Sequence, residues 1–263
     1  MQRTLGILAG AGTQLFFIFT VWHLFSFLNG AHATKQAGGL WTDVLLALQY
    51  AIPHSLLLMP SIKKRLTRWI SGAFYGSFYC IATCAGLLVT FYFWKSSPVV
   101  IWQLESTGAT SATFLFYFAW GSLLYSLSLT GLGYQTGLTQ WWYWLMNKKQ
   151  PSREFTPHSL YRFLRHPVYL SFMGLLWFTP LMTLDRLLLA VLWSIYILVG
   201  SYLKDERLAF YIGAPYREYQ SRVAGYPFFI LGPLGKRSPA PQVIIDKQPT
   251  LPALPKVGSR RAA

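Results

Sequence analysis

Six runs of apolar residues, each near the length that crosses a lipid bilayer, constrain this chain more than any other feature. A spanning helix needs about 20 consecutive apolar residues, with a range of about 17–25. The sequence therefore predicts an all-α integral membrane protein, built as a bundle of about six transmembrane helices. The six runs are Leu5–Leu28, Leu40–Met59, Ala73–Trp94, Ser111–Leu129, Val168–Leu184 and Leu187–Leu203.

Composition and the spacing of the last two runs refine this prediction. Only 12% of the residues are charged, whereas a soluble domain carries about 25%. The last two runs are short and are separated only by Asp185 and Arg186, which favours a tight helical hairpin. If one arm of this hairpin is re-entrant, the bundle has five spans.

The distribution of basic residues predicts the orientation. If the amino terminus is cytoplasmic, only Lys35, Lys95 and Arg186 of the 23 Lys and Arg residues fall on the outer side. Since cytoplasmic loops carry the excess of Lys and Arg, both termini are predicted to be cytoplasmic. Topology and attraction to anionic lipid then explain the net charge of +15 without a nucleic-acid partner.

The chain divides into two parts by composition. Residues 1–231 form the predicted membrane domain, in which the aromatic and basic segment 140–153 is expected to lie in the interface. Residues 232–263 are rich in Pro and basic side chains, so we expect a disordered tail. Oligomeric state does not follow from these features.

Ionisable residues gather at the cytoplasmic ends of the predicted hairpin. Arg165, His166 and Tyr169 precede and begin its first arm, while Asp205 and Glu206 follow its second. Basic residues at span ends are commonly anchors that reach toward the headgroups. The hairpin, however, brings an acidic pair beside them, which favours a polar site open to the cytoplasm.

These side chains suit a zwitterionic ligand that is partly cationic. Glu206 is expected to anchor an ammonium group or ribose hydroxyls, and Arg165 a carboxylate through two parallel bonds. The ring of Tyr169 would face a cationic centre. His54, in the second run, is either a proton carrier or a buried histidine bonded to another helix. The sequence has no zinc-ligand spacing, no nucleotide-binding glycine loop and no Gly-x-Ser-x-Gly elbow, so no metal site is predicted.

Residues 160–219 resemble the membrane methyltransferases related to isoprenylcysteine carboxyl methyltransferase. The matching positions are Arg165-His166-Pro167-Val168-Tyr169, Asp205-Glu206, Leu208, Gly213 and Tyr216-x-x-Tyr219. The resemblance implies S-adenosylmethionine as cofactor, bound mainly within residues 158–222. By that resemblance, the cofactor-binding residues are His166, Pro167, Tyr169, Asp205, Glu206, Tyr216 and Tyr219.

The run around His54-Ser55 and its basic loop is similar to a bacterial subgroup of that family, the methanethiol S-methyltransferases. This similarity implies a small lipophilic thiol as substrate, such as methanethiol, methylated to dimethyl sulfide. Arg165, His54 and His166 are then catalytic, since a cationic cluster favours the thiolate and either histidine accepts its proton. Carboxyl methylation of an isoprenylcysteine-like acceptor, a nicotinamide-dependent membrane reductase and a non-catalytic assembly or transport factor stay open as alternatives.

Overall fold

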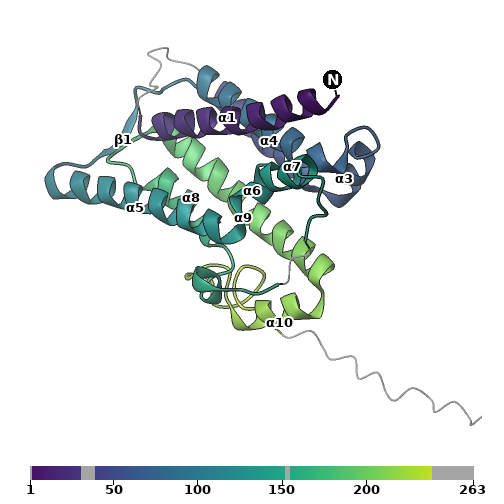
Figure 1. Cartoon of the computed structure of the whole chain (residues 1–263). Helices are drawn as coiled ribbons and strands as arrows, with labels where there is room; N and C mark the ends of the chain where they lie inside the picture. Colours follow the sequence, from purple (N-terminus) through teal and green to yellow (C-terminus); the bar gives the residue numbers. More distant parts are fainter. Residues whose placement is uncertain (1, 31–38, 152–154, 239–263) are drawn as a thin grey trace, which may run out of the picture.

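Helices make up nearly all of the regular structure. A computed structural model describes residues 2–30, 39–151 and 155–238 of the chain. Helix α9 is long and α8 is short, and two very short strands lie near the far end of the bundle from α10 (Figure 1). In chain order the elements are α1 (Gln2–Leu28), α2 (Leu40–Leu58), α3 (Pro60–Leu66), α4 (Gly72–Phe93), β1 (Val100–Gln103), α5 (Ser106–Thr130), α6 (Leu132–Gln135), α7 (Leu138–Leu145), a 3-10 turn η1 (Ser159–Arg162), α8 (Pro167–Trp177), β2 (Leu181–Thr183), α9 (Leu184–Ile212) and α10 (Ala214–Arg222).

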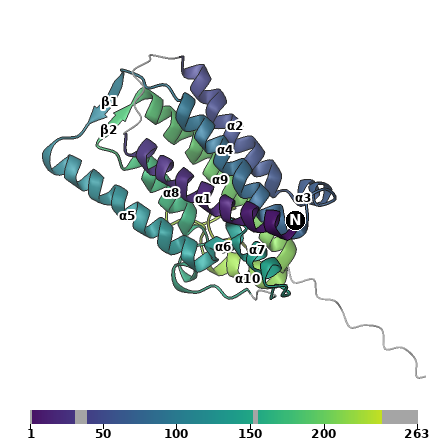
Figure 2. The same cartoon turned by 45° about the horizontal axis from the view of Figure 1, so that its top comes forward.

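The long helices form a bundle in which chain neighbours are not always spatial neighbours. Helix α4 packs between α1 and α2, α9 packs between α2 and α8, and α8 packs against α5. Figure 2 shows the strands at one end of the bundle and α3, α7 and α10 toward the other. The main apolar core lies toward the strand end, where the ring of Phe27 stacks on that of Phe91 at 4.7 Å.

The number of spans is smaller than the six predicted. Among the described residues, four helices are long and apolar enough to cross a membrane: α1, α4, α5 and α9. Helices α2 and α3 qualify only as one bent span with an angle of 79° between them, which gives five and agrees with the alternative count.

The predicted fifth span, Val168–Leu184, is not a helix of membrane-spanning length. Its helix, α8, ends at Trp177 after 11 residues, although the apolar run continues to Leu184. Pro180 disfavours the helical conformation at the residue before it, and Leu181–Thr183 pair as β2 with β1 in an antiparallel ribbon. The all-α prediction therefore misses this ribbon. Helix α9 is correspondingly longer than predicted and continues past Leu203 to Ile212.

The segment predicted to lie in the membrane interface packs on the bundle. In α7, the indole of Trp141 donates a hydrogen bond to the Gly6 carbonyl at 2.9 Å, and the side chain lies directly over Gly10. Trp144 packs edge-on against Phe74 at 4.8 Å. Small residues on α1 therefore let an aromatic helix approach closely, and α7 is part of the fold.

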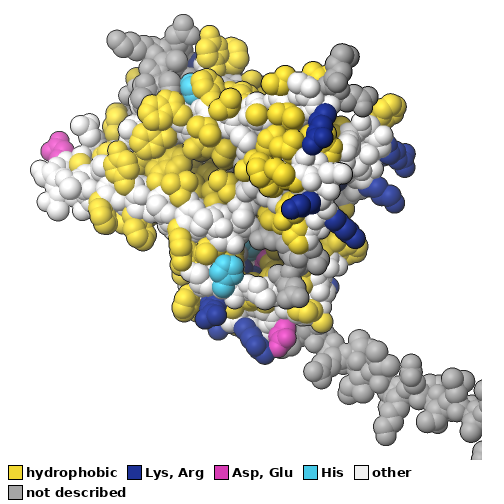
Figure 3. All heavy atoms as spheres, in the orientation of Figure 1, with side chains coloured by type: hydrophobic (Ala, Val, Ile, Leu, Met, Phe, Trp, Pro, Cys, Tyr) yellow, Lys and Arg dark blue, Asp and Glu magenta, His cyan; other side chains and the backbone are white. Residues whose placement is uncertain are grey.

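Basic side chains gather at the end of the molecule away from the strands. Figure 3 shows Lys and Arg on the side of α3 and α7 and around α10, with apolar side chains over the bundle between. Lys63, Lys64 and Arg65 all lie on α3, and Lys148 follows α7. The charge asymmetry read from the sequence is thus an asymmetry of the folded protein.

Candidate active site at the basic end of the bundle

The start of α8 and the last turns of α9 bring the predicted site residues together. Pro167 occupies the first turn of α8, where its missing N–H costs no hydrogen bond, and His166 precedes it. On α9, Trp193, Ile197, Ser201, Asp205 and Ala209 are all buried. Their spacing of four residues makes one face of the helix, and this face carries the carboxylate of Asp205 to the start of α8.

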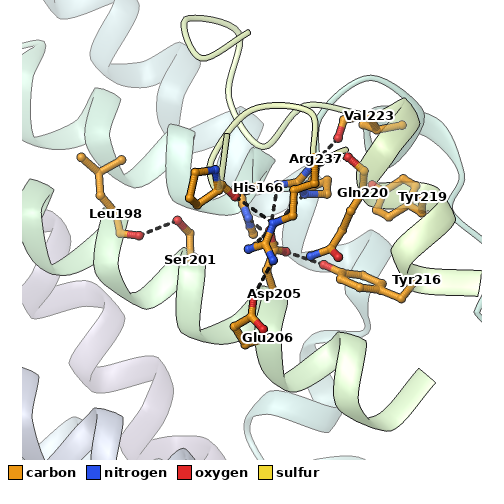
Figure 4. A network of polar contacts seen from close by, with 12 residues as sticks. His166, Leu198, Ser201, Asp205, Glu206, Tyr216, Tyr219, Gln220, Val223 and Arg237 are labelled. Carbon is orange, nitrogen blue, oxygen red and sulfur yellow. Dashed lines mark hydrogen bonds and ion pairs between the residues drawn. The ribbon is translucent and has the colours of Figure 1, made fainter. Parts of the chain in front are cut away.

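Asp205 and Arg165 form an ion pair at the centre of the site. The Arg165 Nη2 lies 2.8 Å from Oδ2 of Asp205, and Nε donates to the same oxygen at 3.1 Å. Neither side chain has any exposed surface. Two charge-assisted hydrogen bonds that converge on one carboxylate oxygen fix the guanidinium relative to Asp205. Figure 4 shows Asp205 at the meeting point of the surrounding polar side chains.

The guanidinium of Arg165 also holds the carboxyl-terminal part of the described chain. It donates to the carbonyls of Gln220 (3.1 Å), Val223 (2.6 Å), Gly235 (2.8 Å) and Pro233 (3.2 Å). With Asp205, these acceptors use every nitrogen of the side chain. Arg165 therefore has no free N–H group in this arrangement with which to bind a ligand carboxylate, as the sequence predicted it would.

These bonds also correct the domain boundary. We placed the start of a disordered tail at residue 232, yet Pro233 and Gly235 accept bonds from Arg165, and the backbone N–H of Arg237 donates to the Gln220 carbonyl at 3.0 Å. The folded part extends at least to Arg237 because a buried guanidinium needs acceptors that these residues supply. The rest of the predicted tail, 239–263, lies outside the described residues.

His166 is buried between aromatic rings and the Asp205 carboxylate. Its Nε2 lies 3.3 Å from Oδ1 of Asp205, without the alignment of a hydrogen bond. The ring stacks on Tyr169 at 5.5 Å and lies against Tyr226 at 5.5 Å. Burial lowers the pKa of His166, and the nearby Asp205 opposes that shift without reversing it. This shift favours the neutral imidazole, the form that accepts a proton.

Tyr216 and Tyr219, the two tyrosines of the predicted motif, have different roles. The Tyr216 hydroxyl donates to Oδ1 of Asp205 at 2.5 Å, and burial raises the pKa of this phenol. Tyr219 donates to the Tyr161 carbonyl at 2.5 Å and packs with Tyr216 and Phe155 in a small apolar cluster. Tyr216 thus belongs to the charged centre, whereas Tyr219 fixes α10 to the chain before α8.

The two acidic residues also differ in their surroundings. Glu206 pairs with Arg237, and 44% of its side chain is exposed. The Asp205 side chain has no exposed surface. Because adjacent helix positions lie about 100° apart around the axis, only one of them can occupy the buried face. Asp205 is therefore the internal centre of the site, and Glu206 lies at its edge.

His54 lies in a second polar cluster, which is nearer the strand end of the bundle than Asp205 is. Its Nε2 and Nδ1 lie 2.5 Å from the hydroxyls of Tyr79 on α4 and Tyr196 on α9 respectively. The ring of Tyr50 is 5.4 Å away. The structure describes no direct bond between His54 and His166, so the two histidines occupy separate places. We name Tyr50, His54, Tyr79 and Tyr196 the tyrosine–histidine cluster.

Tyr169 lies on the side of α8 between the charged centre and the bundle interior. Its ring stacks with His166, and Nζ of Lys204 lies 5.0 Å from its centroid. A cation within about 6 Å of a tyrosine ring is attracted to its face, so the ammonium of Lys204 pairs with this ring. The predicted contact of Tyr169 with a cationic centre of the cofactor stays a prediction.

Several residues of the site were missed by sequence reasoning. Tyrosines inside apolar runs resemble interface anchors, so Tyr79 and Tyr196 gave no separate signal. Arg237 was hidden in a segment of tail-like composition. Lys204 was detectable, because it directly precedes Asp205 and so lies beside the buried face of α9. The missed side chains are Tyr50, Tyr79, Tyr196, Lys204, Gln220, Tyr226 and Arg237.

Unpaired polar atoms beside Asp205 allow a test of whether the site suits a polar cofactor. Nε2 of Gln220 and Nδ1 of His166 are buried and have no hydrogen-bond partner within the described part of the chain. Buried polar atoms without partners are costly and rare in folded proteins. Together with the half-exposed Glu206 carboxylate, they fit a ligand that carries both donors and acceptors.

The fold and this site define the class of protein. The chain is an integral membrane protein whose apolar bundle carries a buried, ionised polar centre at its basic end. In a membrane protein, such a centre is a candidate functional site.

Comparison with known proteins then identifies the family. The chain is 32% identical to the methanethiol S-methyltransferase of Pseudomonas deceptionensis over 204 residues, covering 77% of this chain and 76% of that protein. It is 29% identical to the methanethiol S-methyltransferase of Mycobacterium tuberculosis over 85% of this chain and 96% of that protein. The chain belongs to the methanethiol S-methyltransferase family and is a methyltransferase.

More distant similarity extends beyond these enzymes. The protein named nurim in Danio rerio is 28% identical over 64% of each chain. No family model matches the sequence, and no solved structure matches it.

Proposed function

We propose that this protein transfers a methyl group from S-adenosylmethionine to a small lipophilic thiol, such as methanethiol, and so forms dimethyl sulfide. The observation that carries the proposal is the Asp205 centre, where a fixed ion pair adjoins buried polar atoms without partners. The names of the relatives supply the acceptor class. The relatives from Pseudomonas deceptionensis and Mycobacterium tuberculosis are both named methanethiol S-methyltransferase, and neither is named a carboxyl methyltransferase or a reductase.

The residues around Asp205 would hold the cofactor. Glu206, at the edge of the site, would take the ammonium group or the ribose hydroxyls, which suit an anionic acceptor. His166 and Tyr169 would line the side that faces the cationic sulfur. Arg165, Tyr216 and Tyr219 would act by fixing this wall, and Pro167 by setting the start of α8.

When bound, S-adenosylmethionine supplies an electrophilic methyl group on a sulfonium. A thiolate, not a thiol, is the nucleophile, so the protein must accept a proton and hold the thiolate in line with the methyl carbon. His54 and His166 are the histidines that would accept it. The surrounding apolar core would keep water from the reacting atoms.

We place this site on the cytoplasmic side of a bacterial inner membrane. The basic end of the bundle carries α3, α7 and the Asp205 centre, and an excess of basic residues is the mark of the cytoplasmic side. In this orientation both termini are cytoplasmic. S-adenosylmethionine is then available directly from the cytosol, while the thiol partitions from the bilayer.

Calorimetric titration of the detergent-purified protein with S-adenosylhomocysteine tests the cofactor assignment. We expect micromolar binding that is lost in His166→Ala and strongly weakened in Glu206→Gln. Arg222→Gln provides a matched control, since Arg222 forms an exposed ion pair on α10 with Glu218 away from the proposed ligand. Normal affinity in both site variants would contradict the assignment.

Product analysis tests the reaction itself. The protein should convert methanethiol and S-adenosylmethionine to dimethyl sulfide, measured by gas chromatography of the headspace. Methylation of a farnesylated cysteine without dimethyl sulfide would assign the carboxyl-methylating function instead. Nicotinamide-dependent reduction without S-adenosylhomocysteine binding would assign the reductase function, and full biological function in Glu206→Gln the non-catalytic one.

A further inference from the structure

His54 lies between two tyrosine hydroxyls that come from different helices. Tyr79 on α4 and Tyr196 on α9 each place a hydroxyl 2.5 Å from one nitrogen of the ring. Ser55 donates a further bond to the Tyr196 oxygen at 3.4 Å. Both nitrogens of His54 are therefore occupied, and no substrate proton can reach the imidazole without passing through a tyrosine.

The proton count of this arrangement leaves one hydroxyl free. A neutral imidazole donates from one nitrogen and accepts at the other. One tyrosine therefore donates its proton to His54, and the other accepts the ring N–H. The proton of that second tyrosine is not used by His54 and can bond to a neighbouring group. This holds for either tautomer of the ring.

Open space lies next to this cluster on α9. A Cβ atom built on Gly200 would have no heavy atom within 4 Å. Gly200 follows Tyr196 by four residues, so both lie on the same side of the helix. Further along, Arg207 donates to the Leu58 carbonyl at the end of α2 at 3.3 Å. The open space thus lies between two contacts of α9 with α2, the contact of Tyr196 with His54 and that of Arg207 with Leu58.

The same side of α9 leads to the proposed cofactor site. Lys204 follows Gly200 by one turn, and its ammonium lies over the ring of Tyr169, which stacks on His166. A small molecule beside Gly200 would lie between the tyrosine–histidine cluster and the Asp205 centre. It would also meet a positive charge at its cytoplasmic side, which favours an anion.

We propose that Tyr79, Tyr196 and His54 form a proton relay that activates the thiol acceptor, which binds in the space beside Gly200. The inference rests on the proposed function and names the acceptor end of that reaction. The thiol proton passes to the oxygen of one tyrosine as that tyrosine's own proton passes to His54. The resulting imidazolium donates to both tyrosine oxygens, so both hydroxyl protons are free to bond the thiolate. The sulfur lone pair then forms the new C–S bond, and the electrons of the broken bond return to the cofactor's sulfur.

Two thiols of different acidity test the relay, and each rate is compared with that of the wild type on the same thiol so that their difference in size cancels. Ethanethiol needs a proton acceptor, whereas a substantial part of trifluoroethanethiol is already ionised near neutral pH because its fluorine atoms withdraw electrons. Removing a general base typically costs about 10²–10⁴-fold in rate. We expect Tyr196→Phe and Tyr79→Phe each to lose about 10²-fold in kcat/KM with ethanethiol, and roughly ten times less with trifluoroethanethiol. Tyr92→Phe, an exposed position on α4, is the matched control and should keep both activities.

The outcome separates a relay from mere packing. Equal losses with both thiols would overturn the relay, because a packing defect does not depend on thiol acidity, and so would unchanged activity in both variants. S-adenosylhomocysteine binding should stay normal in each variant. A wild-type protein that neither binds this ligand nor methylates any thiol would refute the proposed function itself, which is a different result.

A second pair of variants tests the place of the acceptor independently of the hydroxyls. Gly200→Leu should fill the open space, raising KM for ethanethiol at least about tenfold without changing S-adenosylhomocysteine affinity. Gly121→Leu, on α5, also enters open space and serves as the control. Equal KM values in the two variants would place the acceptor elsewhere.

Discussion

Replacing Asp205 with asparagine should destabilise the basic end of the protein more than any other isosteric change at the site. The substitution keeps the size of the side chain and removes its charge. Arg165, whose side chain is fully buried, is then left without a counter-charge. The hydroxyl of Tyr216 also loses a charged acceptor 2.5 Å away.

The expected loss follows from these contacts. Removing one partner of a buried ion pair typically costs about 3–5 kcal/mol. The remaining acceptors of Arg165 are backbone carbonyls, which bind the guanidinium without neutralising it, so they do not restore this free energy. For a chain of this size, about 1 kcal/mol shifts Tm by roughly 2–4 °C. Asp205→Asn should therefore lower Tm by roughly 6–20 °C.

Tryptophan fluorescence during thermal unfolding in detergent measures the change, and hydrogen exchange locates it. Amides in α10 and in residues 224–237 should exchange faster in Asp205→Asn, while those of α1 and α4 should not change. Glu206→Gln is the matched control, because it breaks a partly exposed pair and should cost at most about 1 kcal/mol. Equal Tm values for the two variants would refute the assignment of Asp205 as the buried centre.

Three further predictions concern other parts of the structure. Burial lowers the pKa of His166, so below its ordinary pKa of about 6.5 the unfolded chain binds more protons than the folded one. Stability should fall as the pH drops through that value, and less steeply in His166→Gln; parallel curves of Tm against pH would contradict this. Truncation after residue 231 removes acceptors of Arg165 and should lower Tm, whereas truncation after residue 238 keeps them; equal Tm values would show that these contacts are dispensable. Gly10→Ala should cost about 1–3 kcal/mol, because its Cβ would meet the Trp141 indole. Gly12→Ala on the same helix meets nothing, and equal thermal stability of the two would show that α7 does not pack on α1.

Much of the fold follows from apolar segment length alone. The long runs predicted α1, α2, α4, α5 and α9, because lipid leaves the backbone few ways to satisfy its hydrogen bonds. The prediction of a full span at α8 was wrong for two reasons. Hydropathy does not distinguish a helix from the turn and strand that follow Trp177, and the pairing of β2 with β1 depends on a segment about eighty residues earlier.

The site was predictable to the extent that topology determines it. A hairpin brings the start of one arm beside the end of the other, so the basic residues before α8 were expected beside the acidic pair on α9, with His166 next to Glu206. In the structure it is Asp205, rather than Glu206, that contacts Arg165 and His166, whereas Glu206 pairs with Arg237. The different burial of Asp205 and Glu206 depends on where the helix ends. Only continuation of α9 beyond Leu203 extends the four-residue spacing of the buried face to Asp205. The partners of His54 depend on the packing of α2, α4 and α9, which the sequence does not encode locally.

The bonds from Arg165 to the carbonyls of Pro233 and Gly235 have a consequence for biosynthesis. The ribosome makes all the long helices before it reaches these residues, and those helices can enter the membrane as they emerge. The guanidinium cannot obtain its last acceptors until residue 235 has left the exit tunnel. A nascent chain is thus inserted in the bilayer before its polar centre is complete, and this centre can mature only after residue 235 has emerged from the ribosome.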